Sequence, residues 1–166
     1  MTSGVKCTDQ VKDVCDEMRL VKSDADHQKR IRLVVFNIKD SCIDVTKCVC
    51  EEELTQMGKD GFSYFQEMMA DGECCYILYD CHFDTKECRN KQELVFLTWC
   101  SDNASIKNKM CYAASKDAIK KCVGSIKHNL EMTEKGDCVS RACFAEKLGK
   151  GILSLEGVSC SGHADD

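Results

Sequence analysis

The sequence contains no proline and no long apolar run. Average usage would place about eight prolines in a chain of 166 residues. Its turns must therefore rely on Gly, Asp, Asn and Ser, as in Asp60-Gly61 and Asp71-Gly72. No stretch approaches the length of a membrane span, and the N-terminus has no apolar core of a secretory signal. We therefore expect a chain that stays in the cytosol and outside the bilayer.

Net positive charge and catalytic motifs are also missing. The formal net charge of -5 argues against a nucleic-acid-binding protein held by phosphate contacts. The chain has no glycine-rich loop that would cradle a phosphate, no nucleophile elbow and no carboxylate pair at a spacing that suggests acid–base chemistry. We expect a binding protein rather than an enzyme, with no cofactor.

Cysteine, by contrast, is abundant, with 15 residues. That density is typical of small secreted disulfide scaffolds, but the count is odd, no secretory signal is evident, and many of the cysteines occupy apolar-patterned positions. A chain of this length can also bury a core without disulfide staples. We expect reduced thiols that behave as small hydrophobic side chains.

Two chemical uses of the cysteines need separate consideration. Cys48-Val49-Cys50, Cys74-Cys75 and the pair Cys138 and Cys143 lack the C-x2-C spacing with which two thiolates share one zinc ion, so we expect no metal site. No cysteine-protease motif surrounds the histidines, which are His27, His82, His128 and His163. A thiol-based redox or metal protein is the alternative from a different functional class, and thiol titration would distinguish it.

Hydrophobic periodicity predicts an α/β (α+β) fold in one domain, with a mixed sheet and helices on its faces. Strands are expected at residues 33–38, 42–50, 74–83, 93–100 and 151–155. Helices are expected at residues 9–21, 61–69, 106–123 and 140–148, and a charged hairpin at 84–92. The folded domain should span residues 1–157, with 1–6 as a flexible arm and 158–166 as a disordered tail.

The longest predicted helix carries two different faces. It follows an apolar strand that ends at Ser101-Asp102-Asn103, and Ser105 is its expected N-cap. On a helical wheel, the face that can pack on the sheet gathers Cys111, Tyr112, Ser115, Ala118, Ile119 and Cys122. The opposite face gathers charged residues around a small apolar patch, namely Lys109, Lys116, Asp117, Lys120 and Lys121 around Met110, Ala113 and Ala114.

This apolar patch inside a ring of cations has two interpretations. Met is an adaptable contact residue and Ala allows close backbone approach, so the patch fits a partner with an apolar cleft and an acidic rim. Alternatively, the face is an ordinary lysine-rich solvated surface that happens to include Met110. Spacing alone does not decide between the two.

Residues 109–121 (KMCYAASKDAIKK), followed by Ile126-Lys127-His128, closely resemble the long helix of the ADF/cofilin family of actin-binding proteins. Further similarity is found at residues 1–5, 76–80, 145–149 and 154–157, the last two as in vertebrate-type members. The resemblance thus covers nearly the whole chain. It implies a single ADF-homology domain whose central mixed sheet of about five or six strands is flanked by helices on both faces.

The resemblance also implies which residues contact actin. In the family, an actin monomer contacts the N-terminal arm and the long helix, with a methionine in an apolar cleft of actin and lysines paired with acidic groups. The matching residues here are Ser3, Gly4, Lys107, Lys109, Met110, Ala114, Lys116, Asp117, Lys120 and Lys121. Among them, Ala114 stands where a serine is more usual. A second, filament-specific contact would use Arg89, Lys91, Glu146 and Lys147.

The family's activity is implied in the same way. Its members bind monomeric and filamentous actin, prefer the ADP form, and sever and depolymerise filaments by favouring a twisted filament conformation, without hydrolysing a bond themselves. We expect this activity from a monomer of the chain. The open alternative keeps the fold but binds filaments without severing them.

Three kinds of regulation are also implied by the resemblance. A kinase would act on Ser3 and add about −1.5 to −2 charges to an arm that must lie against acidic actin. His128 and Glu93 would form a pH-sensing pair. Phosphoinositide head groups would compete with actin for a basic surface made of Lys107, Lys109, Lys127 and His128.

Localisation follows from these expectations. The protein should be cytoplasmic and associated with the cytoskeleton. A nuclear location would depend on the short basic run at residues 29–32. Its interruption by Ile31 favours the alternative interpretation, a basic strand edge rather than a nuclear signal.

Overall fold

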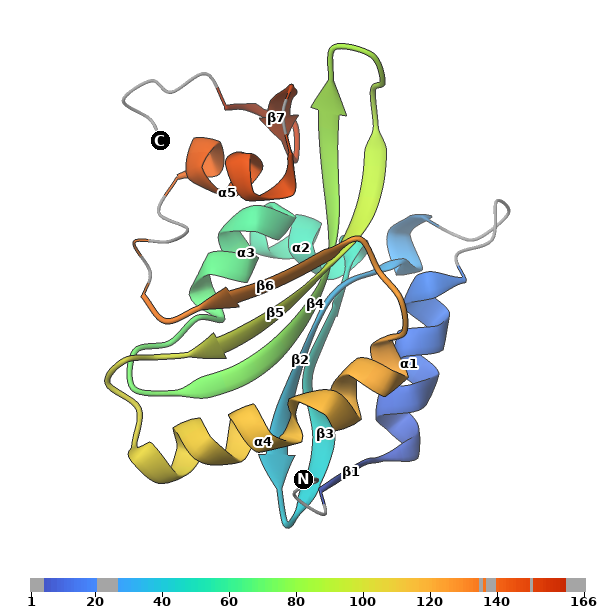
Figure 1. Ribbon diagram of the computed structural model, residues 1–166. Helices are drawn as coiled ribbons and strands as arrows, with labels where there is room; N and C mark the ends of the chain where they lie inside the picture. Colours follow the sequence, from blue (N-terminus) through green and yellow to red (C-terminus); the bar gives the residue numbers. More distant parts are fainter. Residues whose placement is uncertain (1–4, 21–26, 135, 137–139, 150, 161–166) are drawn as a thin grey trace.

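A mixed β-sheet forms the centre of the structure, a computed structural model that describes residues 5–20, 27–134, 136, 140–149 and 151–160 (Figure 1). Within these ranges the sheet has eight strands. They are β1 (Lys6–Cys7), β2 (Ile31–Lys39), β3 (Cys42–Cys50), β4 (Cys74–Thr85), β5 (Lys91–Cys100), β6 (His128–Met132), β7 (Ile152–Leu155) and β8 (Val158–Ser159).

Strand pairing is antiparallel through the middle of the sheet and parallel near its edges. In the order β1-β3-β2-β4-β5-β6, β1 runs parallel to β3 and β6 runs parallel to β5. The long strand β4 pairs with β5 and, at its far end, with β7. Because parallel neighbours need a crossover connection, the helix α4 (Ile106–Val123) crosses one face of the sheet between β5 and β6.

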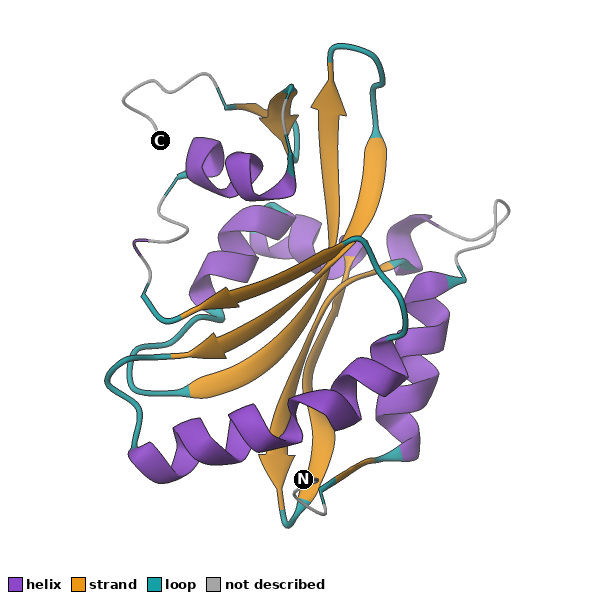
Figure 2. Ribbon diagram, viewed as in Figure 1, coloured by secondary structure: helices purple, strands orange, loops and turns teal. Residues whose placement is uncertain are grey.

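Helices cover both faces of the sheet (Figure 2). α1 (Asp9–Arg19) packs with α4 on one face. α3 (Gly61–Glu67) and α5 (Arg141–Leu148) pack on the other, together with the short α2 (Glu51–Met57). A 3-10 turn, His27–Lys29, precedes β2. None of the described helices combines the length and the hydropathy needed to cross a membrane.

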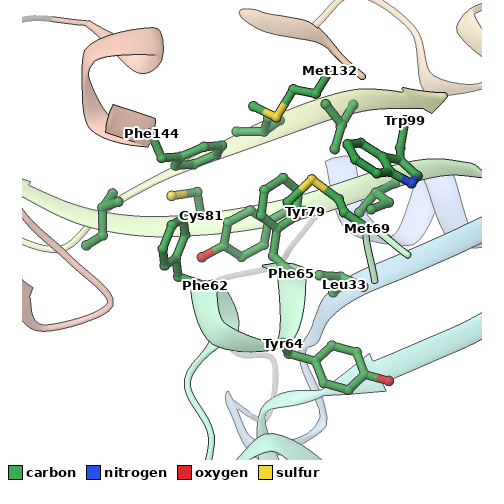
Figure 3. Close-up of a cluster of buried hydrophobic side chains, with 14 of the residues drawn as sticks. Leu33, Phe62, Tyr64, Phe65, Met69, Tyr79, Cys81, Trp99, Met132 and Phe144 are labelled. Atoms are coloured by element: carbon green, nitrogen blue, oxygen red, sulfur yellow. The ribbon is translucent and has the colours of Figure 1, made fainter. Parts of the chain in front are cut away.

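Each face of the sheet has its own hydrophobic core. On the α3/α5 face, Phe65 stacks on Tyr79 with ring centroids 4.9 Å apart, and Phe62 lies 5.3 Å from Phe144 (Figure 3). Trp99 is buried in the same cluster. The core under α1 and α4 is built mainly from small and aliphatic side chains, among them Val11, Cys15, Val34, Ile43, Ile119 and Val123.

The predicted fold class is confirmed, but α2 and the strands β1, β6 and β8 are among the elements that were not predicted. α2 starts directly after β3, has three glutamates in its first turn and buries only Leu54, so it lacks the apolar periodicity that reveals a helix. β6 is five residues long and buries only its ends, His128 and Met132. So short a strand is recognisable only from its position beside β5.

Several predicted boundaries need correction. The helix expected at 61–69 ends at Glu67, with Met68 as its C-cap, and the helix expected at 9–21 ends at Arg19. The expected disordered tail begins too early, because residues 158–159 form β8 on β7 and the Cys160 N–H donates to the Leu153 carbonyl at 2.9 Å. The expected flexible arm at 1–6 is also too long, because Lys6 already belongs to β1 and pairs with Cys42 of β3. Residues 161–166 of the tail and residues 1–4 of the arm lie outside the described residues.

Candidate functional site

The helix α4 is held on the sheet by a buried tyrosine. The Tyr112 hydroxyl accepts a hydrogen bond from the Ile38 backbone N–H at 2.9 Å, and the Tyr76 hydroxyl donates to the Tyr112 backbone carbonyl. Ser105 caps the helix, since its hydroxyl accepts from the Asn108 N–H at 3.1 Å. These contacts fix which face of α4 is turned outward.

The outward face of α4 presents apolar side chains to solvent. Met110 is 67% exposed, and Ala113 and Ala114 are exposed beside it. Ile106, which is 76% exposed, lies one turn before Met110 and extends the apolar surface. The sequence-based patch left out Ile106, although its spacing of four residues from Met110 places both on one side of the helix. We call Ile106, Met110, Ala113 and Ala114 the outward patch.

The cations around the outward patch have different surroundings. Lys107 is exposed. Lys109 donates from Nζ to the Asp102 carbonyl at 2.7 Å, and Lys116 forms an ion pair with Glu131. The hydrogen bond and charge of Lys116 hold the pKa of the Glu131 carboxyl below its ordinary value. The other predicted charged residues on α4 are Asp117 and Lys121, which are exposed, and Lys120, which is half-buried.

A second group of charges joins β5 to the start of β6, and we call it the Glu93 cluster. Nε2 of His128 lies 2.7 Å from Oε1 of Glu93, while the Nζ atoms of Lys127 and Lys91 lie 3.5 and 3.6 Å from Oε2. Burial alone would raise the pKa of Glu93, but the hydrogen bond with His128 and the neighbouring cations bring that pKa below its ordinary value. His128 itself is buried.

The residues expected to contact filaments lie near the projecting β4–β5 hairpin (Figure 1). Arg89 is exposed in that hairpin, and the Lys91 ammonium lies 5.7 Å from the centre of the Phe83 ring. Glu146 and Lys147 are exposed on α5. Because β7 follows α5 and pairs with β4, the fold brings α5 to the same end of the sheet as the hairpin.

A buried ion pair ties the C-terminal segment to the sheet, and we call it the Arg32 cluster. Arg32, which is 2% exposed, pairs with Glu156 in the turn between β7 and β8. Oε2 of Glu156 also accepts from the Tyr79 hydroxyl at 2.6 Å, and Glu51 contacts the same guanidinium at 2.7 Å. Burial opposes the charge of Arg32, but the Glu156 carboxylate raises the pKa of Arg32 above its ordinary value.

The cysteines in the described part of the chain are free thiols. Burial raises the pKa of Cys7, Cys15, Cys75 and Cys100 to about 12. Thiols with so high a pKa are poor nucleophiles at neutral pH. Across the described ranges, no three His, Cys, Asp or Glu side chains are grouped as metal ligands.

The N-terminal arm leads into the domain beside α4. Ser3 and Gly4 lie outside the described residues. The strand β1 that follows them pairs with β3, and the Cys7 thiol donates to the Ala118 carbonyl of α4 at 3.5 Å. The base of the arm is therefore next to the helix that carries the outward patch.

Together, these elements form one domain that exposes the outward patch on a single helix. A family model described as "Cofilin/tropomyosin-type actin-binding protein" matches residues 4–149. The chain belongs to this family of actin-binding proteins.

Solved structures share the fold. The cofilin of Streptomyces griseoflavus has a TM-score of 0.71 at 22% identity, covering 89% of this chain and 99% of that chain. Actin depolymerization factor 2 of Plasmodium berghei has a TM-score of 0.72 at 23% identity, with coverage of 89% and 99%. A human coactosin-like protein has a TM-score of 0.64 at 13% identity, with coverage of 90% and 92%. At these identities the likeness is one of fold.

Proposed function

We propose that this protein binds monomeric and filamentous actin, prefers the ADP form, and severs and depolymerises filaments in the manner of vertebrate-type cofilins. The observation that carries the proposal is the outward patch on α4, in a chain that belongs to an actin-binding family. Burying an exposed side chain such as Met110 in an apolar cleft is favourable by about 1.5–3 kcal/mol. Lys107, exposed beside the patch, suits an acidic rim.

The proposed filament surface uses Arg89, Lys91, Glu146 and Lys147. The support for it is that the hairpin and α5 lie at one end of the sheet, away from the outward patch, so a filament subunit can contact each surface (Figure 1). Severing follows from linkage, because a protein that binds a twisted filament better than a relaxed one shifts the filament toward the twisted form. The protein acts by binding, without a cofactor or a hydrolysed bond.

Co-sedimentation with ADP-actin filaments, combined with imaging of filament length, tests the proposal. We expect the wild type to bind and shorten filaments and Lys107→Ala/Lys109→Ala to lose both effects, because each lysine flanks the outward patch. Lys59→Ala is the matched control, since Lys59 is also a surface lysine but pairs with Glu67 beside α3, on the opposite face. Equal loss in the control would contradict the assignment of the surface.

Other outcomes of the same assay separate the alternatives. Filament binding without shortening would support an actin binder that does not sever. A wild type that bound neither filaments nor monomers would overturn the proposal and favour thiol chemistry. The raised pKa values of the buried cysteines argue against that alternative, which predicts at least one fast-labelling thiol in the native protein.

Phosphorylation of Ser3 by a kinase is the first proposed control. The support is that β1, which begins three residues after Ser3 in the sequence, lies beside α4, the helix that carries the proposed actin surface. A phosphate would add about −1.5 to −2 charges facing acidic actin. Ser3→Glu should bind monomers more weakly than Ser3→Ala, and equal affinities in a monomer-binding assay would count against this control.

A pH response is the second proposed control. Its support is the 2.7 Å contact between Nε2 of His128 and Oε1 of Glu93, because a protonated imidazole would form a charge-assisted hydrogen bond with that carboxylate. Loss of the proton as pH rises would weaken that contact and loosen the start of β6, which follows α4 directly.

Phosphoinositide binding and localisation complete the proposal. Lys107 and Lys127 are exposed and can meet anionic head groups, with Lys109 beside them. His128 is buried and contacts Glu93, the carboxylate that Lys127 also approaches. Vesicles with phosphatidylinositol bisphosphate should retain wild type more than Lys127→Ala, and neutral vesicles should retain neither. We propose a monomer in the cytoplasm and on the cytoskeleton. The basic run at residues 29–32 supports a strand edge rather than a nuclear signal, because Arg32 is buried in the Arg32 cluster.

A further inference from the structure

Two cysteines lie directly opposite each other where β4 begins and β5 ends. Cys74 pairs with Cys100 in the antiparallel ladder, and just beyond this pair the Ser101 N–H donates to the Glu73 carbonyl at 3.1 Å. That bond makes Cys74 and Cys100 a non-hydrogen-bonded pair, whose Cα atoms are typically about 4.5 Å apart. Disulfides bridge Cα atoms that are about 4.4–6.8 Å apart, so the spacing of the backbone already suits one.

The two thiols also lie on the same side of the sheet. Both cysteines pack in the core under α1 and α4, and their side chains are joined by a hydrogen bond. Cys75, the next residue along β4, belongs to the opposite core, under α3 and α5. The thiol of Cys100 therefore has Cys74, and not Cys75, within reach.

Burial makes this pair slow to react. The adjacent pair on the same face includes Thr98, whose buried hydroxyl has no hydrogen-bond partner in the described part of the chain. Few polar groups are thus available to stabilise a charge. Burial and the neighbouring Cys74 thiol raise the pKa of Cys100 to about 12, so only a small fraction of Cys100 is thiolate at neutral pH.

Cys100 is nevertheless open to solvent on one side. It is half-buried and lines a groove of about 320 Å³ between α4 and the strands β5 and β6, together with Lys109 and Ala113. The Lys109 ammonium donates to the backbone carbonyl of Asp102, which is neutral, so its positive charge can attract an anionic reagent. Cys74 is only 4% exposed, and Cys100 is therefore the thiol that a reagent meets first.

We propose that Cys74 and Cys100 are a site of oxidative modification, at which oxidised glutathione, an anionic disulfide, converts them into a cross-strand disulfide. In the first step, the Cys100 thiolate attacks one sulfur of the reagent and releases one reduced glutathione, which leaves a mixed disulfide. In the second step, Cys74 loses its proton and attacks Cys100 Sγ, which releases the second glutathione. The protein gives up two electrons and two protons, and the two glutathione molecules take them up. The site needs no actin and so goes beyond the function proposed above.

The disulfide would reinforce contacts that already join the same two segments. The Ser101 hydroxyl, which follows Cys100, accepts from the Gly72 N–H at 2.9 Å. It also donates to Oδ1 of Asp71 at 3.0 Å. A cross-link that closes a loop of about 25 residues constrains the unfolded chain, so the oxidised protein should unfold at a temperature at least about 4 °C higher than the reduced protein.

The test incubates the full-length, reduced protein with oxidised glutathione at about pH 7 and 8, blocks the remaining thiols, and maps tryptic peptides by mass spectrometry. We expect a peptide linked through Cys74 and Cys100 that forms about tenfold faster at the higher pH, because the Cys100 thiolate limits the rate. Cys74→Ala should abolish the link. Cys75→Ala is the matched control, since Cys75 lies in the same tryptic peptide but faces the other core, and it should keep the link.

A second variant covers the case in which Cys74→Ala does not fold. Cys100→Ala changes a half-buried position, and it should also abolish the link. The unfolding temperature of each reduced variant shows whether it is folded before oxidation.

Several results would overturn the proposal. One is the absence of the link, with or without a stable glutathione adduct on Cys100. Another is a link that persists in Cys74→Ala or disappears in a folded Cys75→Ala. An unfolding temperature that oxidation leaves unchanged would contradict the stabilising role of the link. None of these measurements contains actin, so their failure would leave the proposed function standing, and a protein without actin affinity could still form the disulfide.

Discussion

The Arg32 cluster and the Glu93 cluster use the same chemistry in different surroundings. Each gathers cationic and polar groups from separate segments around one carboxylate. Glu156 is 5% exposed and Arg32 is 2% exposed, whereas the Glu93 side chain is 19% exposed and that of Lys127 is 67% exposed. Burial therefore makes the first cluster a structural tie, and partial exposure leaves the second open to pH and salt.

The two clusters also lie in different parts of the fold. The Arg32 cluster fastens the β7–β8 turn to the sheet and so positions the segment around α5. The Glu93 cluster lies at the start of β6, just after α4. A buried ion pair suits the β7–β8 turn, because no group of the Arg32 cluster needs to change its charge there. A titratable contact suits the start of β6, because it adjoins the proposed actin surface.

Removing the buried carboxylate should have the largest effect. Glu156→Gln leaves the Arg32 guanidinium buried with a weaker partner, and we expect the free energy of unfolding to fall by about 3 kcal/mol. Urea denaturation measures the change. Glu51→Gln is the matched control, because Glu51 contacts the same guanidinium but is 35% exposed, and it should cost less than about 1 kcal/mol. Equal losses in the two variants would contradict the structural role of burial.

A smaller effect is expected for Glu93→Gln. The folded-state pKa of Glu93 is depressed, so its contribution to stability is present above its ordinary pKa of 4.5 and is lost as pH falls through the folded-state value. The wild type should lose up to about 1 kcal/mol more stability than Glu93→Gln between neutral pH and pH of about 3. Lys127→Ala keeps the contact between Glu93 and His128. Its additional loss of stability over the same pH range should therefore remain more than half as large as that of the wild type. If stability depended on pH in the same way in the wild type and in Glu93→Gln, Glu93 would make no such contribution to stability.

The smallest effect concerns pH and severing. Gln at position 128 cannot become charged. The change in filament-severing rate between about pH 6.5 and 8 should therefore be smaller in His128→Gln than in the wild type. The reduction should be less than about fivefold, because the pair is partly exposed. His82→Gln is the control, because His82 also lies near a carboxylate, 3.3 Å from Asp80, but within the α5 end of the molecule. If His82→Gln altered the pH profile as much as His128→Gln, the Glu93 cluster would not be the sensor.

Local patterns in the sequence predicted the faces of α4. Its apolar spacing placed Tyr112, Ser115 and Ile119 against the sheet, where they are buried, because helical periodicity needs only neighbouring residues. The pairing of Arg32 with Glu156 could not be found in this way. The two residues are 124 positions apart, and only the folded sheet brings them together.

The internal partners of the site residues were also beyond sequence reasoning. Lys116 read as a free surface cation, yet it pairs with Glu131 on β6, a strand that was itself missed. The unpaired hydroxyl of Thr98 has no sequence signal, because a threonine in an apolar strand is ordinary. Such features depend on packing between elements, which periodicity within one element does not describe.

The most direct test of the account replaces Met110 at the centre of the outward patch. Met110→Glu should weaken binding to ADP-actin filaments at least about tenfold in co-sedimentation, because a carboxylate replaces the side chain that we propose enters an apolar cleft with an acidic rim. Met57→Glu makes the same substitution at a residue that is 43% exposed on α2, across the sheet, and should bind as the wild type does. Full binding by Met110→Glu, or an equal loss in Met57→Glu, would contradict the assignment of actin binding to α4.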